Sequence, residues 1–233
     1  MTAGRTGGRS VGRRLLLVLA GCAQESAPAA STAKSAGDSI PEIAAAFETA
    51  RDTLDNIDSP AVWHGPPNEH WVITTAKDGD VLVVADATTG RLIKRVGGTG
   101  KAPGQLDRPN GVAVLDDLVF VVERDNARLQ VFRLPAWQSL GTFGNSELRL
   151  PYGLAVQRAG AGAYDIYVTD NYELVEDSVP PDSLLGQRVR SYRVIVTDNK
   201  VQAQLTRTFG DTQGPGVLRV VESIAIDSAQ GKL

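Results

Sequence analysis

Short apolar runs alternate with turns rich in glycine, proline and aspartate along most of this chain, and one five-residue pattern recurs among them. Its order is a polar or aromatic residue, a small residue, an aliphatic residue (proline in the first copy), an alanine and another aliphatic residue. The copies are Asp58-Ser-Pro-Ala-Val62, Asn110-Gly-Val-Ala-Val114, Tyr152-Gly-Leu-Ala-Val156 and Glu222-Ser-Ile-Ala-Ile226. A pattern that recurs every several tens of residues, with β-type runs between its copies, indicates a repeat architecture.

The runs between the copies predict four strands in each of the first three repeats, which is the form of a β-propeller blade. The expected strands are 60–63, 71–76, 81–85 and 91–96, then 112–114, 118–122, 129–134 and 139–143, and then 154–156, 164–168, 189–194 and 204–209. Each blade ends in a matching element, Arg95-Val-Gly97, Thr142-Phe-Gly144 or Thr208-Phe-Gly210. We therefore predict an all-β fold, a β-propeller of four-stranded blades that is six-bladed when complete.

A fourth blade is expected to start at Val220, and the sequence stops at Leu233, where its second strand should begin. Radial repeats close only when the ring is complete. The sequence thus predicts about three and a half blades of a C-terminally truncated propeller. We expect such a fragment to be inactive or weak, because its ring is open.

The N-terminal segment has the composition of a secretory signal, with Arg13-Arg14 before an apolar core at 15–20 and then Gly21-Cys22. The tetrad 19–22 resembles the bacterial lipobox, in which the cysteine is acylated. The alternative is a free cysteine in a disordered leader. We predict a lipoprotein-type signal peptide at 1–22, an Ala/Ser-rich flexible tether at 23–42 and the propeller at 43–233, with a short helical or extended lead-in at 43–54. The protein would be an exported cell-envelope lipoprotein that contacts the membrane only through a lipid on Cys22.

Composition narrows the function classes. Apolar residues make up 42% and charged residues 22%, as in soluble globular proteins. The net charge of −3 argues against nucleic-acid binding, which favours a basic surface. One cysteine excludes an internal disulfide, and we expect a monomer. His64 and His70 lie beside a Pro/Gly-rich turn without the spacing of a transition-metal site, so no such site is predicted there. Tryptophans 63, 71 and 137 are expected in the core.

Candidate chemistry gathers at one end of the predicted ring. The lead residues of the four copies are Asp58, Asn110, Tyr152 and Glu222, and Lys77 and Arg124 follow the second strands of their blades. Carboxylate and carbonyl oxygens suit a hard cation such as Ca²⁺. Lysine and arginine suit a phosphate. No nucleophile has a partnered base, so hydrolysis would use metal-activated water. Alternatively, the acidic and amide residues satisfy turn amides, and 124–126 is a hairpin turn followed by a structural Arg128.

These residues carry a family resemblance. Asp58-Ser-Pro-Ala-Val-Trp63, Val72-Ile-Thr-Thr-Ala-Lys77, Arg124, Tyr152-Gly153 and Val221-Glu222 resemble, in order, the motifs of the β-propeller phytases. The resemblance implies calcium-dependent release of phosphate from inositol hexakisphosphate. It implies Ca²⁺ ligation by Asp58, Asn110 and Glu222 and phosphate binding by Lys77, Arg124 and Tyr152. The implied catalytic set is Asp58, Glu222, Lys77, Arg124 and Tyr152.

The chain also departs from that pattern. Ser59 stands where the family has a second acidic residue, and Asp170-Asn171 stands where it has a phosphate-binding lysine. The link 97–111, with Gly-Gln-Leu and then Arg-Pro-Asn-Gly, resembles the NHL class of propellers instead. Two alternatives follow: a non-catalytic NHL-like binding module at the cell surface, or a lactonase-like propeller hydrolase that uses one divalent metal.

Overall fold

The computed structural model describes residues 42–49 and 52–233. The predicted signal peptide at 1–22 with its Cys22, and the tether up to residue 41, lie outside the described residues. The chain divides into two units, 1–44 and 45–233, and the second contains every strand of the described ranges. In the same ranges no helix is long and apolar enough to cross a membrane.

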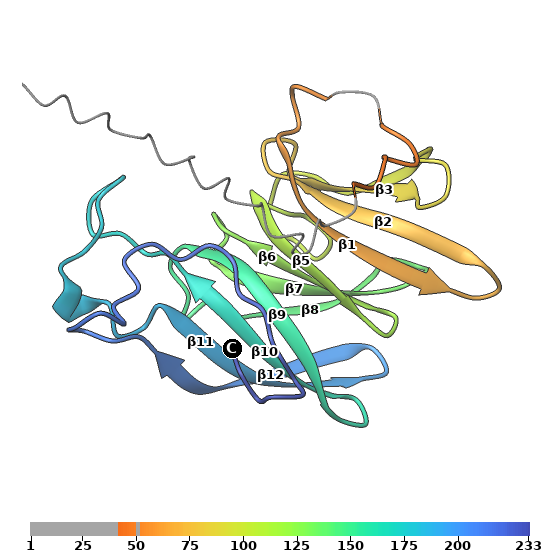
Figure 1. Ribbon diagram of the computed structural model, residues 1–233. Coiled ribbons are helices and arrows are strands. Elements are labelled where there is room, and N and C mark those ends of the chain that lie inside the picture. Colours follow the sequence, from red (N-terminus) through yellow and green to blue (C-terminus); the bar gives the residue numbers. More distant parts are fainter. Residues whose placement is uncertain (1–41, 50–51) are drawn as a thin grey trace, which may run out of the picture. The chain divides into compact units, whose positions relative to one another are not determined.

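Three antiparallel sheets of four strands each make up the fold (Figure 1). In each sheet the strands pair in chain order. Sheet one contains β1 (Ile57–Gly65), β2 (Glu69–Ala76), β3 (Val81–Asp86) and β4 (Leu92–Gly97). Sheet two contains β5 (Pro109–Leu115), β6 (Leu118–Glu123), β7 (Arg128–Arg133) and β8 (Gln138–Phe143). Sheet three contains β9 (Pro151–Gly160), β10 (Ala163–Asp170), β11 (Val189–Thr197) and β12 (Lys200–Phe209), with a short 3₁₀ helix η1 (Asp182–Leu184) before β11.

The predicted all-β class and the strands of the first three blades are confirmed, with most strands extending beyond their predicted cores. The first strands of the sheets are neighbours, β1 against β5 and β5 against β9, as in part of a propeller. The lead-in at 43–54 forms neither helix nor strand where it is described.

The fourth copy of the pattern does not form the predicted strand. Residues 221–226 have no ladder, and the segment after them makes one isolated bridge, Asp227 to Lys232. A strand exists only through hydrogen bonds to a neighbour, and the described residues supply no partner strand for this copy. The copy lies instead against sheet three, where the Val221 amide donates to Asn171 Oδ1 at 3.1 Å.

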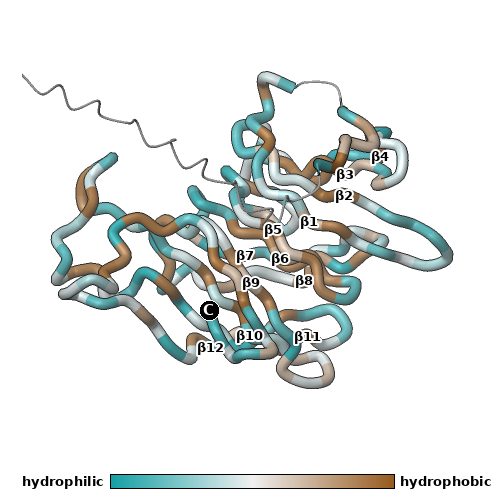
Figure 2. Tube along the Cα trace, viewed as in Figure 1, coloured by the Kyte–Doolittle hydropathy of each residue, from teal (hydrophilic) through white to brown (hydrophobic). Residues whose placement is uncertain are grey.

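Strand alternation explains where the core lies (Figure 2). In β6, the odd positions Val119 and Val121 join a cluster shared with sheet one, and the even positions Phe120 and Val122 join a cluster shared with sheet three. A strand buried on both faces needs apolar residues throughout, which accounts for the unbroken apolar run at 118–122. The three tryptophans are buried in the cluster between sheets one and two, as predicted.

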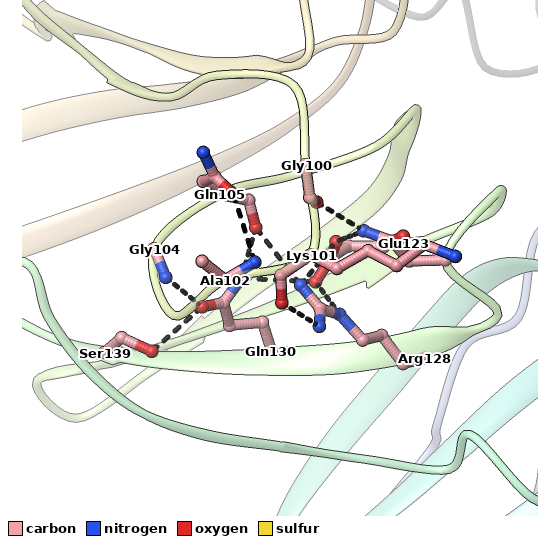
Figure 3. A network of polar contacts seen from close by, with 10 residues as sticks. Gly100, Lys101, Ala102, Gly104, Gln105, Glu123, Arg128, Gln130 and Ser139 are labelled. Carbon is pink, nitrogen blue, oxygen red and sulfur yellow. Dashed lines mark hydrogen bonds and ion pairs between the residues drawn. The ribbon is translucent and has the colours of Figure 1, made fainter.

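A buried polar network fixes the link between sheets one and two (Figure 3). Glu123 is fully buried at the end of β6, and its carboxylate accepts from Arg128 Nε at 2.7 Å and Asn126 Nδ2 at 2.6 Å. The Arg128 guanidinium also donates to the carbonyls of Lys101 and Gln105 in the link. The predicted structural role of Arg128 is confirmed, because its donors hold the link onto sheet two.

Sheet three repeats this arrangement with other residues. Asp170 is fully buried, pairs with Arg190 at 3.1 Å and accepts from the amide of Leu150 in the preceding link. Arg188 lies over the Tyr172 ring and donates to the carbonyls of residues 170, 172, 218 and 219. Burial lowers the pKa of Arg188. The links that enter sheets two and three therefore each make hydrogen bonds to a buried charge of the sheet that follows.

Candidate functional site

The inner ends of sheets one and two are joined by a threonine hydroxyl. Thr75, near the end of β2, accepts a hydrogen bond from the Ser59 amide at 3.0 Å and donates to the Asn110 carbonyl at 2.8 Å. The hydroxyl therefore connects the first copy of the repeated pattern to the second. Thr75 is fully buried, and its hydroxyl is satisfied by these two backbone groups.

The later copies meet in the same way. Thr169 in β10 accepts from the Gly153 amide at 2.8 Å and donates to the Glu222 carbonyl at 2.9 Å. A Cβ at Gly153 would lie 2.1 Å from the Glu222 carbonyl oxygen, and one at Gly111 would lie 2.8 Å from the Tyr152 carbonyl oxygen. The small residue at the second position of the pattern is thus required by the close approach of successive copies. All four copies come together in chain order.

Three predicted site residues lie within reach of one another. The Lys77 ammonium is 3.3 Å from the Asp58 carboxylate and 6.0 Å from the centroid of the Tyr152 ring. The Lys77 side chain is 14% exposed and that of Asp58 34%. The pair is therefore partly buried, and the Lys77 ammonium keeps only a small contact with solvent.

Asn110 is the buried member of the group. Its residue is 1% exposed, and neither its side-chain oxygen nor its side-chain nitrogen has a hydrogen-bond partner within the described protein. Leaving a buried polar group unpaired costs about 1–3 kcal/mol. The alternative that Asn110 satisfies turn amides is wrong for its side chain, because its buried carboxamide makes no hydrogen bond with the described residues.

Two predicted residues stand apart from this group. The Arg124 guanidinium pairs with its own neighbour Asp125 at 2.8 Å, as expected for the hairpin turn after β6. Glu222 is exposed, and its recorded contact is made by its backbone carbonyl with Thr169. The structure thus brings together Asp58, Lys77 and Tyr152 but records no side-chain contact that would join Arg124 or Glu222 to them.

The fit of a calcium ion is partial. Across residues 42–49 and 52–233, no three His, Cys, Asp or Glu side chains gather into a metal-binding group. Ca²⁺ takes 6–8 oxygen ligands. Asp58 and the unpaired Asn110 oxygen are two candidates, and backbone carbonyls and ligand oxygens would have to complete the set. The donor set suits an ion shared with a bound phosphate better than one held by protein alone.

Asn171 does not replace the lysine that the phytase resemblance implies. Its side-chain oxygen accepts a hydrogen bond from the Val221 backbone amide, and its backbone amide donates one to the Leu150 carbonyl. It is a structural residue that docks the fourth copy. Sheet three therefore supplies no cation at this position.

The linking threonines were not predicted as part of the site. Thr75 and Thr169 are the next-to-last residues of β2 and β10. In β6 of sheet two, the equivalent residue is Val122. The partners of Thr75 lie 16 and 35 residues away, so no local pattern indicates its role. Only an alignment of the ends of β2 and β10 would have shown a threonine at the same position in both.

Comparison with protein families gives one match of limited length. Residues 106–132 match the NHL repeat. This range runs from the end of the link through β7, and it contains the network of Glu123 and Arg128. The NHL-like part of the sequence prediction is confirmed for this stretch. No curated protein sequence gives a significant match.

Solved β-propeller structures resemble the chain at low identity. Hydrazine synthase of Kuenenia stuttgartiensis is 13% identical with a TM-score of 0.44, covering 69% of this chain and 38% of its own. Hsv2p of Kluyveromyces lactis is 16% identical with a TM-score of 0.36, covering 63% and 45%. A quinohemoprotein alcohol dehydrogenase from Pseudomonas putida HK5 is 18% identical with a TM-score of 0.39, covering 70% and 23%. The chain spans less than half the length of these three proteins.

Proposed function

We propose that the end of the propeller formed by Asp58, Lys77, Asn110 and Tyr152 binds a phosphorylated small molecule. The supporting observation is that Lys77 of sheet one lies 6.0 Å from the Tyr152 ring of sheet three, while sheet two contributes the unpaired Asn110 carboxamide. Three sheets thus each direct a different group, an ammonium, a phenol and an amide, to one end. Charge-assisted hydrogen bonds from such a cation are about twice as strong as neutral ones.

The finer proposal is hydrolysis of phosphomonoesters such as inositol hexakisphosphate. Asp58, Asn110 and Glu222 would hold Ca²⁺, and Lys77, Arg124 and Tyr152 would bind and orient the phosphate. When bound, Ca²⁺ would supply an activated water for attack on phosphorus. The bond between phosphorus and the alcohol oxygen would break, giving inorganic phosphate and the alcohol.

Binding is tested first, with calorimetric titration of the full chain by inositol hexakisphosphate with and without Ca²⁺. We expect Lys77→Gln to weaken binding at least about tenfold, because a hydrogen bond to a charged group contributes about 1.5–3 kcal/mol. Lys94→Gln is the matched control, since Lys94 is exposed on the outer strand β4 and loses the same charge. Equal losses in both variants, or no binding to the parent, would refute the proposed site.

Turnover is tested separately by phosphate release with Ca²⁺ and with a chelator. Calcium-dependent release that falls in Glu222→Gln supports the finer proposal. Binding without release contradicts hydrolysis and favours the NHL-like binding module. Turnover of lactones without release of phosphate favours the lactonase-like alternative.

Export and lipid attachment form an independent part of the proposal. Expression in bacteria with an alkyne-tagged fatty acid should label the parent chain and not Cys22→Ser. Membrane association that persists unchanged in Cys22→Ser would contradict attachment through this residue.

A further inference from the structure

The β1–β2 hairpin brings the two histidines of the chain together. His64 and His70 are direct partners in the antiparallel register, and they are the only histidines in the sequence. Their Nδ1 atoms are 2.8 Å apart, and their ring centroids are 4.9 Å apart with 70° between the planes. Opposite residues of an antiparallel pair have Cβ atoms about 4.5–5.5 Å apart. Two imidazoles in this position therefore converge without distortion of the strands.

The pair lies on the outer face of sheet one. The adjacent Trp63 and Trp71 point into the cluster shared with sheet two. Because side chains alternate along a strand, His64 and His70 point to the opposite face. His64 is exposed and His70 partly exposed. The proposed phosphate site adjoins the other end of the same strands, where Ile57 pairs with Ala76, so the two sites are separate.

A separation of 2.8 Å allows two chemical states. One Nδ1 can carry a proton and donate it to the other, or both can offer lone pairs to one metal ion. Ligand nitrogens about 2.0–2.1 Å from a metal lie about 2.9 Å apart at a right angle and about 3.3 Å apart in a tetrahedron. The observed separation is close to that of neighbouring positions in a square arrangement, which Cu²⁺ and Ni²⁺ favour.

We propose that His64 and His70 form a two-imidazole site for a divalent transition metal of the Cu²⁺ or Ni²⁺ type, with water in the remaining positions. Imidazole is a poor ligand for Ca²⁺, which takes oxygen ligands, so this site is chemically distinct from the proposed calcium site. Metal binding displaces the shared proton from Nδ1 to the Nε2 atom of the same ring or to water, and acid weakens metal binding because the ligands must be neutral. The ion would also join the two strands beside the turn that connects them.

The test titrates the full chain with Cu²⁺ in a Cys22→Ser background, so that the single thiol neither binds nor reduces the metal. Electron paramagnetic resonance reports nitrogen coordination, and the thermal midpoint reports stabilisation of the folded state. We expect one equivalent of Cu²⁺ with two imidazole nitrogens. His64→Gln or His70→Gln should weaken this binding at least about tenfold, because each removes one of only two protein ligands.

Two controls keep the result specific. Glu69→Gln changes the charge of the same hairpin and should leave binding unchanged, since Glu69 pairs with Gly65 outside the histidine pair. The double variant of both histidines measures metal held by the amino terminus, and this background is subtracted. Both histidines are exposed or partly exposed, so the glutamine variants should fold. Cu²⁺ binding that is no tighter in the parent than in either single variant would overturn the proposal and leave a shared proton only.

Discussion

Sheets one and two place opposite kinds of residue at the same structural position. In sheet two, the last residue of β6 and the first residue of β7 are Glu123 and Arg128. The corresponding residues of β2 and β3 in sheet one are Ala76 and Val81. The first pair is a fully buried ionic contact, and the second is apolar. Both sheets nevertheless have four strands in the same order. The buried charges are therefore not needed to form a blade.

The difference shows what the charges do. Glu123 and Arg128 hold the link that enters sheet two from sheet one. Sheet one uses the Asp55–Arg95 pair instead, in which the Arg95 side chain is 42% exposed. A blade preceded by a long glycine-rich link needs an internal anchor for it, and the NHL match coincides with that anchor.

The largest expected effect is loss of the anchor in sheet two. Arg128→Met leaves the Glu123 carboxylate buried without its cation, and breaking a buried pair in this way costs about 3–5 kcal/mol. Arg95→Met in sheet one should cost less than Arg128→Met, because the Arg95 side chain is 42% exposed and water can reach its partner more easily. Urea denaturation measures both. Similar losses in the two variants would show that the comparison is mistaken.

A smaller effect is expected for the threonine links. Thr75→Val removes the hydroxyl shared by Ser59 and Asn110 and should destabilise by about 1–3 kcal/mol. Thr169→Val should cost less, because its partner Glu222 is exposed and water can take over the contact. Denaturation of the two variants side by side tests this order. A larger loss for Thr169→Val would mean that the fourth copy is held more firmly than its exposure indicates.

The Asp55–Arg95 pair of sheet one is expected to make stability depend on pH in the acidic range. Hydrogen bonding to Arg95 lowers the pKa of Asp55 from 3.8. A lowered folded-state pKa gives stability that is present above the unfolded value and lost as the pH falls below about 4. Asp55→Asn should therefore flatten the decline of unfolding free energy between about pH 5 and pH 2. An unchanged acid profile would contradict a role for Asp55 in this decline.

The smallest effect is expected where sheet two lacks the threonine. Val122→Thr introduces a hydroxyl at the position of Thr75, next to the copy that begins at Tyr152. If the hydroxyl reaches a backbone carbonyl there, the change in stability should stay within about 1 kcal/mol. A loss of more than about 2 kcal/mol would show that β6 and β9 do not approach as β2 and β5 do.

The sequence supports prediction of the strands because their signals are local. Alternating or unbroken apolar runs between turn residues predict β1 to β12. The same pattern at 222–226 forms no strand, because a strand also needs a neighbouring strand to pair with. The contacts that build the site are long-range. Lys77 and Tyr152 are 75 positions apart, and no local signal indicates that their side chains meet.

The contact between His64 and His70 is easier to predict than the long-range site contacts, and harder to predict than the strands. His64 and His70 lie symmetrically about the turn 66–68, so counting outward from the turn pairs them. A search for linear metal-ligand spacings overlooks them, because strand pairing and not helical spacing brings their rings together.

The anchoring of the links also bears on where the chain can be divided. The link 98–108 is held from both sides, by Arg128 of sheet two and by Asp78 and Asp80 in the β2–β3 turn of sheet one. A segment copied from Gly98 to Phe143 would carry the contacts to Arg128 and lose those to sheet one. A blade exchanged in this way would therefore need matching carboxylates in the blade before it.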